Sequence, residues 1–166
     1  MESITLLKVA LIGDGNVGKT SIARRYCEGS FSESRIMTIG VDFQTKVVAL
    51  EDRTVKLSIW DVAGQDRFAV VRESFYRGTL AAALVYDISD PESFAHLPRW
   101  VDEIRGQVPQ VKFVVVGNKS DLTGVVSSED AGAFAASLHA PLCITSALTD
   151  NGVEDMFLQL AHQAVG

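Results

Sequence analysis

The fold is decided by one stretch near the start of the chain, Gly13-Asp14-Gly15-Asn16-Val17-Gly18-Lys19-Thr20. An apolar run, residues 6–12, precedes it, and a helix-prone segment, residues 20–26, follows it. A Gly-x-x-x-x-Gly-Lys-Thr spacing between a strand and a helix is typical of a phosphate-binding loop, in which backbone N–H groups and the helix N-terminus converge on phosphate oxygens. We expect Lys19 to reach the outer phosphates and the Thr20 hydroxyl to bind magnesium. The sequence therefore predicts a nucleotide site, and the alternative is a glycine-rich turn followed by an ordinary helix.

The size and composition of the chain suit one globular domain, residues 1–166, with its own core. The net charge of −6 argues against non-specific binding to nucleic acid. No apolar stretch is long enough to span a bilayer, and the start Met1-Glu2-Ser3 lacks a secretory signal. Cys27 and Cys143 have neither metal-binding nor redox spacing, which favours reduced thiols. We therefore expect a cytoplasmic protein.

Two kinds of apolar pattern predict six strands. Nearly continuous apolar runs are typical of strands covered on both faces in a parallel sheet, and they span residues 6–12, 80–88, 111–116 and 142–144. Residues 41–47 and 55–59 instead alternate between apolar and polar side chains on either side of the turn Glu51-Asp52-Arg53. That alternation predicts an antiparallel hairpin.

Helix signals lie between these strands. The first predicted helix covers residues 19–28 and stops at Gly29. Asp90-Pro91 is a good helix start, and Pro98 should kink that helix or restart it. Strands that alternate with helices predict a three-layer α/β domain with helices on both faces of a mostly parallel sheet, one strand of which is antiparallel.

The last two helices carry capping signals. Ser127-x-x-Asp130 resembles a capping box, and Asn151-x-x-Glu154 is expected to cap the final helix. Residues 66–77 are predicted to form a short helix or a mobile loop, and residues 31–40 a loop. Ligands of such sheets bind at the carboxyl ends of the strands, where every motif considered below is expected to lie.

Three further elements narrow the type of nucleotide. Asp61 ends an apolar strand, where a carboxylate can hold magnesium through water, and Ala63-Gly64-Gln65 follow it. In Asn118-Lys119-Ser120-Asp121, a buried Asp121 carboxylate could accept from both N1–H and the exocyclic amine of guanine, a donor pair that adenine lacks. A backbone N–H at Ser146-Ala147 could meet the guanine O6. The alternative for Asn118–Asp121 is a polar surface loop.

Together these motifs resemble a known family. Five motifs, in order along the chain, resemble those of Ras-superfamily small GTPases: Gly13–Thr20, Thr38, Asp61–Gln65, Asn118–Asp121 and Ser146–Ala147. Four stretches resemble the Rab branch specifically: Ile39–Phe43, Trp60–Gln65, Tyr76–Gly78 and Leu84–Ile88. The resemblance implies the G-domain form of the P-loop NTPase fold, GTP or GDP with Mg²⁺ as cofactors, and slow GTP hydrolysis by a two-state switch.

The resemblance also implies residue roles. Thr38 would close over magnesium and the γ-phosphate, Gly64 N–H would hold that phosphate, and Gln65 would orient the attacking water. Phe31 would stack on the guanine edge, and Lys119 would pack over the base. The implied catalytic residues are Gln65, Lys19 and Gly64, and the implied metal ligands are Thr20, Thr38 and, through water, Asp61; Arg35 is an additional catalytic hypothesis that this resemblance does not imply. The implied nucleotide-binding residues are Gly13, Asp14, Gly15, Asn16, Val17, Gly18, Lys19, Thr20, Ser21, Phe31, Thr38, Gly64, Asn118, Lys119, Asp121, Ser146, Ala147 and Leu148.

The family's partners are implied in the same way. Effectors would dock at Ile39–Phe43, Trp60 and Phe75, although core packing is an equal alternative for Phe75. An exchange factor and a GTPase-activating protein are expected, with the protein itself a monomer in membrane trafficking or signalling. The sequence ends at Ala164-Val165-Gly166 without a cysteine for prenylation, so membrane association would need a tail beyond it.

One position departs from the family. Arg35 lies three residues before Thr38, where Ras and Rab proteins usually have an aromatic residue and where heterotrimeric G-protein α subunits carry their catalytic arginine. Arg35 is therefore either an arginine finger supplied in cis or a solvated loop arginine. The sequence leaves two alternative functions, a nucleotide-binding scaffold with negligible turnover and a nucleoside or nucleotide kinase. Gln65 and Gly15 argue against the scaffold, and Asn118–Asp121 argue against the kinase.

Overall fold

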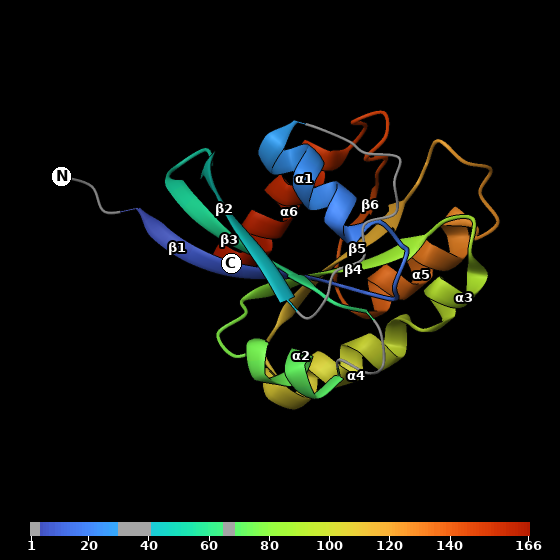
Figure 1. Ribbon diagram of the computed structural model, residues 1–166, viewed down its shortest axis with the longest axis horizontal. Helices are drawn as coiled ribbons and strands as arrows, with labels where there is room; N and C mark the ends of the chain where they lie inside the picture. Colours follow the sequence, from blue (N-terminus) through green and yellow to red (C-terminus); the bar gives the residue numbers. More distant parts are fainter. Residues whose placement is uncertain (1–3, 30–40, 65–68) are drawn as a thin grey trace.

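The computed structural model describes residues 4–29, 41–64 and 69–166 of the chain. Its centre is a six-stranded sheet with the strand order β2-β3-β1-β4-β5-β6 (Figure 1). The strands are β1 (Thr5–Ile12), β2 (Val41–Ala49), β3 (Thr54–Val62), β4 (Ala81–Asp87), β5 (Lys112–Asn118) and β6 (Leu142–Ile144). β2 pairs antiparallel with β3, whereas all other neighbours are parallel. The predicted sheet, mostly parallel with one antiparallel strand, is confirmed.

Helices cover both faces of this sheet. They are α1 (Lys19–Glu28), α2 (Ala69–Phe75), α3 (Pro91–Ala95), α4 (Leu97–Gln107), α5 (Ser128–Ser137) and α6 (Val153–Val165). α1 and α6 lie on one face, and α2, α4 and α5 lie on the other (Figure 1). The predicted three-layer α/β arrangement is therefore present. Across the described ranges, the helices are too short or too polar to span a bilayer.

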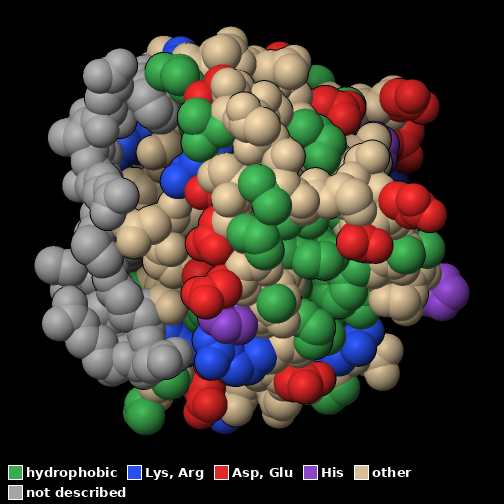
Figure 2. Space-filling model, turned by 90° about the vertical axis from the view of Figure 1, so that its right-hand side faces the viewer, with side chains coloured by type: hydrophobic (Ala, Val, Ile, Leu, Met, Phe, Trp, Pro, Cys, Tyr) green, Lys and Arg blue, Asp and Glu red, His purple; other side chains and the backbone are tan. Residues whose placement is uncertain are grey.

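The parallel strands all run toward the same side of the molecule, so the segments that follow them meet there. Figure 2 views that side. Among the described residues visible on it, acidic, basic and apolar side chains intermix, without one continuous basic surface. This is the side on which the candidate site is built.

Alternation along β1 supplies both layers of the core. Val9 and Leu11 belong to the cluster covered by α1 and α6, whereas Ala10 and Ile12 belong to the cluster covered by α4 and α5. Successive side chains of a strand point to opposite faces, so a strand buried on both faces reads as a continuous apolar run. The run that predicted β1 is therefore explained by helices on both sides.

The helix signals were mostly correct. Asp90 caps α3 by accepting from the Glu92 N–H at 3.1 Å, and the Ser127 hydroxyl caps α5 by accepting from the Asp130 N–H at 3.0 Å. Pro98 lies in the first turn of α4, which begins two residues after α3 ends, so the helix restarts rather than kinks. α2 confirms a short helix within residues 66–77, but residues 31–40 and 65–68 lie outside the described ranges.

The predicted cap of the last helix was wrong. Gly152, not Asn151, occupies the N-cap of α6, and its φ of 71° is left-handed. Asn151 instead exchanges two backbone hydrogen bonds with Ser146, at 2.9 and 3.1 Å. A Cβ on Gly152 would lie 2.3 Å from the carbonyl oxygen of Ile144. The close backbone approach to the end of β6 therefore requires glycine at this position and displaces the cap by one residue.

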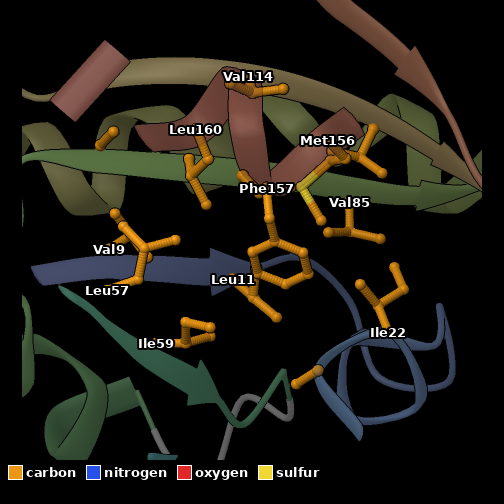
Figure 3. Packing of buried hydrophobic residues seen from close by; sticks show 14 of the residues in the cluster. Val9, Leu11, Ile22, Leu57, Ile59, Val85, Val114, Met156, Phe157 and Leu160 are labelled. Atoms are coloured by element: carbon orange, nitrogen blue, oxygen red, sulfur yellow. The ribbon is translucent and has the colours of Figure 1, made fainter. Parts of the chain in front are cut away.

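Phe157 of α6 is the first side chain to test in this fold. It is fully buried, it points toward Leu11 of β1 (Figure 3), and its ring stacks on Tyr26 of α1 with centroids 4.0 Å apart. We expect Phe157→Ala to lower the free energy of unfolding by about 3–5 kcal/mol, because it leaves a cavity between α1, α6 and the sheet. Urea unfolding measures this loss, and Leu158→Ala, at the neighbouring half-buried position, should cost clearly less. Equal losses for the two variants would contradict this packing.

Candidate functional site

The loop of residues 13–18 joins the carboxyl end of β1 to the start of α1. Gly13 (φ 148°) and Gly18 (φ 99°) have left-handed backbone conformations, and Gly18 is the N-cap of α1. A Cβ on Gly13 would lie 2.2 Å from the Val85 carbonyl oxygen, and one on Gly18 would lie 2.3 Å from Nδ2 of Asn118. Glycine is therefore required for the loop to pack against β4 and β5. A helix that begins in such a loop presents backbone N–H groups to an anion.

Lys19 places a buried ammonium at the centre of this loop. The side chain is 6% exposed, and its Nζ donates to the carbonyl oxygens of Gly13 at 2.8 Å and Asp14 at 2.7 Å. Burial lowers the pKa of Lys19 to about 8, although the nearby carboxylates of Asp61 and Asp14 act in the opposite direction. The loop therefore holds a cation that has lost most of its water, and an anionic ligand would restore its charge balance.

Thr20 and Asp61 form the candidate metal-binding pair. The Thr20 hydroxyl in the first turn of α1 donates to Oδ2 of Asp61 on β3 at 2.5 Å, and Asp61 is buried. Hydroxyl and carboxylate oxygens are hard ligands, and Mg²⁺ in nucleotide sites takes one or two such protein ligands together with water and phosphate oxygens. The described residues at this position therefore fit Mg²⁺. The other predicted metal ligand, Thr38, lies outside the described residues.

Gly64 packs directly against the phosphate loop. A Cβ on Gly64 would lie 2.4 Å from the Gly13 carbonyl oxygen and 2.5 Å from backbone atoms of Asp14 and Gly15. The backbone that follows β3 therefore touches the backbone that follows β1, and glycine is needed for the contact. Gln65, the next residue, lies outside the described residues, as do Phe31 and Arg35.

Asn118, the last residue of β5, is hydrogen-bonded to the phosphate loop. It is 1% exposed, its Nδ2 donates to the Val17 carbonyl oxygen at 2.9 Å, and its Oδ1 accepts from the Thr145 hydroxyl at 2.9 Å. Lys119 donates from Nζ to the Asn16 carbonyl oxygen at 2.7 Å and lies 3.1 Å from Oδ2 of Asp87. The segment thus supports the phosphate loop as well as offering polar groups of its own.

Asp121 differs from the expectation in one respect. A buried carboxylate was expected to select guanine, but Asp121 is exposed. Its Oδ1 accepts from the Ser146 hydroxyl at 2.7 Å, which fixes the orientation of the carboxylate at the mouth of the site. Ser146 and Ala147 are buried beside it, and Leu148 is exposed. The predicted base-binding residues are therefore neighbours.

Arg25 was missed by the sequence analysis. This residue of α1 donates from Nε to the Ala147 carbonyl oxygen at 2.7 Å and from Nη2 to the Leu148 carbonyl oxygen at 2.9 Å. It therefore ties the segment after β6 to the helix that follows the phosphate loop. A lone arginine in the last turn of a helix gives no signal of a partner 122 residues away.

The Asp14 side chain turns away from the loop. Trp100 of α4 donates from Nε1 to its Oδ1 at 2.8 Å, and Nδ1 of His96 lies 2.5 Å from its Oδ2. Asp14 was predicted to bind nucleotide, and this geometry leaves only its backbone for that role. Neither His96 nor Trp100 carried a sequence signal for the site.

Most of the described predicted residues come together at one edge of the sheet. Each of these residues lies at or after the carboxyl end of β1, β3, β5 or β6. They are the phosphate loop, Thr20, Asp61, Gly64, Asn118, Lys119, Asp121 and Ser146–Leu148. Ser21 lies in the first turn of α1, half-buried. A buried ammonium, a helix N-terminus and two hard oxygen ligands together suit a polyphosphate with a divalent cation.

Comparison with known proteins agrees with this chemistry. A family model described as Ras family matches residues 8–165. The chain is 44% identical to GTP-binding protein ypt1 of Schizosaccharomyces pombe over 161 residues, which cover 95% of this chain and 79% of that protein. It is 43% identical to GTP-binding protein YPTM2 of Zea mays over 159 residues, 94% of this chain and 78% of that protein.

The lowered pKa of Lys19 makes a testable contribution to stability. The folded-state pKa of about 8 lies below the ordinary value of 10.5, so stability from this group is present above pH 10.5 and is lost as pH falls toward 8. In ligand-free protein, Lys19→Met removes the titrating ammonium and, with it, the stability that the native chain loses as pH falls. The free energy of unfolding of the variant relative to the native chain should therefore rise by about 2 kcal/mol from pH 10 to pH 7.5. Urea unfolding at the two pH values measures the difference, and a constant difference would contradict the burial argument.

Proposed function

Because this chain belongs to the Ras family as a Rab-like small GTPase, a protein that binds GTP and GDP and hydrolyses GTP, we propose that it acts as a two-state switch in membrane trafficking or signalling. The observation that carries the proposal is the contact of Gly64 with the phosphate loop. Gly64 is the residue implied to sense the γ-phosphate. Its backbone lies directly against the loop backbone that is implied to hold the phosphates. A switch requires such contact between the nucleotide and a segment that changes with it.

The phosphates bind at the loop of residues 13–18. Backbone N–H groups of the loop and of the first turn of α1 surround the β-phosphate, and Lys19 exchanges its two carbonyl partners for phosphate oxygens. Thr20, Thr38 and, through water, Asp61 would hold Mg²⁺, which would supply positive charge to neutralise the β- and γ-phosphate oxygens while the bond from the γ-phosphorus to the bridging oxygen breaks. The contact between the half-buried Thr20 hydroxyl and the buried Asp61 carboxylate supports this role.

Guanine binds at the segments after β5 and β6. The Asp121 carboxylate accepts from N1–H and the exocyclic amine, and a backbone N–H of Ser146–Leu148 meets O6. The stem of Lys119 packs over one side of the base and Phe31 lies at its edge. The bonds from Arg25 to Ala147 and Leu148, and from Asn118 to Val17, support this role because they hold the base-binding and phosphate-binding segments together.

GTP is hydrolysed by in-line attack of a water molecule on the γ-phosphate, and Gln65 orients this water. The Gly64 N–H and Thr38 bind the γ-phosphate in the GTP state. Its loss releases both contacts, so the segment Phe31–Phe43 and the segment after Asp61 change conformation together. An exchange factor and a GTPase-activating protein control the two states, and the protein works in the cytoplasm as a monomer.

Effectors bind an exposed aromatic cluster formed by Phe43, Trp60 and Phe75, next to Ile39–Phe43. Phe43 and Phe75 are 54% and 37% exposed, and Trp60 lies between them with ring centroids 5.2 Å and 5.6 Å away. Apolar side chains gathered at a surface mark interaction sites, and large aromatic rings contribute most of the binding energy at such sites. The exposure of Phe75 supports docking over simple core packing.

Base selectivity provides the first functional test. Asp121→Ala removes both acceptors for guanine, so we expect its GDP affinity to fall by roughly 10²-fold or more. Asp52→Ala, which removes an exposed carboxylate from the β2–β3 turn, should leave GDP affinity unchanged. Fluorescent analogues of GDP, GTP and ATP measure the affinity of the native chain and of both variants for each nucleotide. Native protein that bound ATP as tightly as GTP would overturn the assignment.

Arg35 provides a second test, in single-turnover hydrolysis of pre-loaded GTP without partners. An arginine finger supplied in cis predicts that Arg35→Ala slows hydrolysis at least tenfold, about 1.4 kcal/mol of transition-state stabilisation, while nucleotide affinity holds. Arg53→Ala, in the β2–β3 turn, is the control for loss of a loop arginine. Equal rates for native and Arg35→Ala would make Arg35 a solvated loop residue. A native chain without multiple-turnover phosphate release would favour the scaffold alternative.

A further inference from the structure

Arg72 of α2 is a buried arginine without an assigned role. It is 3% exposed, and its Nε and Nη2 donate to Oε2 and Oε1 of Glu103 on α4 at 3.0 and 2.8 Å. The Tyr76 hydroxyl donates to the same carboxylate, and the guanidinium lies over the Trp100 ring, 4.5 Å from its centroid. Burial alone would lower the pKa of Arg72, but the hydrogen bonds and charge of Glu103 raise it, so the side chain remains a cation.

A further donor of Arg72 reaches the phosphate side of the molecule. Its Nη1 donates to the carbonyl oxygen of Ala63 at 3.0 Å, in a buried hydrogen bond. The Ala63 carbonyl and the Gly64 N–H belong to one peptide unit, which is planar and trans. Because the two groups of a trans peptide point in opposite directions, a partner that fixes the carbonyl also fixes the direction of the N–H. Arg72 therefore sets the orientation of the Gly64 N–H.

Gly64 cannot shift toward the phosphate loop. A Cβ on it would already lie 2.4 Å from the Gly13 carbonyl oxygen and 2.5 Å from the Gly15 backbone nitrogen. The loop therefore blocks movement of this peptide on one side, and the guanidinium holds its carbonyl oxygen on the other. The hydrogen bond from Arg72 opposes rotation of the peptide.

We propose that Arg72 is a positioning residue for the triphosphate state: by holding the Ala63 carbonyl, it aims the Gly64 N–H at the γ-phosphate. The inference rests on the proposed function, in which that N–H binds the γ-phosphate. The anchor is α4, because Glu103 fixes the guanidinium at two points in a fork geometry that a lysine cannot reproduce.

The α4 helix also contacts the phosphate loop directly. Trp100, on which Arg72 stacks, donates to Oδ1 of Asp14 in the phosphate loop. α4 therefore positions the phosphate loop through Trp100 and the Ala63–Gly64 peptide through Glu103 and Arg72. Because GDP has no γ-phosphate, the Arg72 contact should discriminate between the two nucleotides rather than strengthen binding of both.

The test compares GDP with a non-hydrolysable GTP analogue in native protein and in Arg72→Ala. We expect the variant to lose at least tenfold in affinity for the GTP analogue and to keep its GDP affinity within about twofold. Arg72→Lys should remain impaired, because one ammonium cannot serve both Glu103 and Ala63 in the same geometry. The ³¹P resonance of the bound γ-phosphate should also shift in both variants. Arg105→Ala removes an exposed arginine of α4 and should change neither affinity.

A second variant covers the case in which Arg72→Ala does not fold. Glu103→Gln keeps the shape of the partner but weakens its hold on the guanidinium, so the same selective loss should appear in smaller size. If a variant lost affinity for GDP and for the GTP analogue to the same degree, the role of Arg72 would be merely structural. The inference would also be overturned if both variants kept the affinities of the native chain for the two nucleotides. A native chain that bound neither guanine nucleotide would instead overturn the proposed function and, with it, this inference.

Discussion

The site depends on backbone-to-backbone contact around the phosphate loop. At Gly13 and Gly64, a single added carbon would lie within 2.4 Å of a backbone atom of another segment, and at Gly18 it would lie 2.3 Å from the Asn118 side chain. The loop after β1 therefore touches β4 and the segment after β3 through backbone atoms alone. Phosphate oxygens are recognised largely by backbone N–H groups, and these can converge on one point only if their own chains approach this closely.

The same crowding explains why so many charges are buried near the loop. Lys19, Asp61 and Arg72 are all nearly inaccessible, although isolated charges are costly to remove from water. Each is held by hydrogen bonds: Lys19 by two loop carbonyls, Asp61 by the Thr20 hydroxyl, and Arg72 by Glu103 and the Ala63 carbonyl. A buried polar cluster of this kind is stable only when its members keep their partners, so it favours a small number of discrete arrangements over a continuous range. That property suits the proposed two-state switch.

The sequence predicted what depends on neighbouring residues and missed what depends on distant ones. The phosphate loop, the strands and the caps at Asp90 and Ser127 follow from local spacing, and the structure agrees with them. Arg25, Arg72, His96 and Trp100 gave no signal, because each meets a partner that lies close only after folding. The wrong cap at Asn151 has the same origin. Its capping pattern was local, but pairing with Ser146 and the contact of Gly152 with Ile144 decided the geometry.

The register of the β2–β3 hairpin has a consequence for recognition. Phe43 on the edge strand β2 lies directly opposite Trp60 on β3, and the two rings stack. Since side chains alternate between the faces of a strand, a shift of β2 by one residue would carry Phe43 to the other face of the sheet. The aromatic surface is therefore encoded by chain length as well as by residue type. At the proposed effector surface, substitution at Phe43, Trp60 or Phe75 would change the partner, whereas an insertion or deletion between Phe43 and the β2–β3 turn would erase the surface while leaving each of its residues in the sequence.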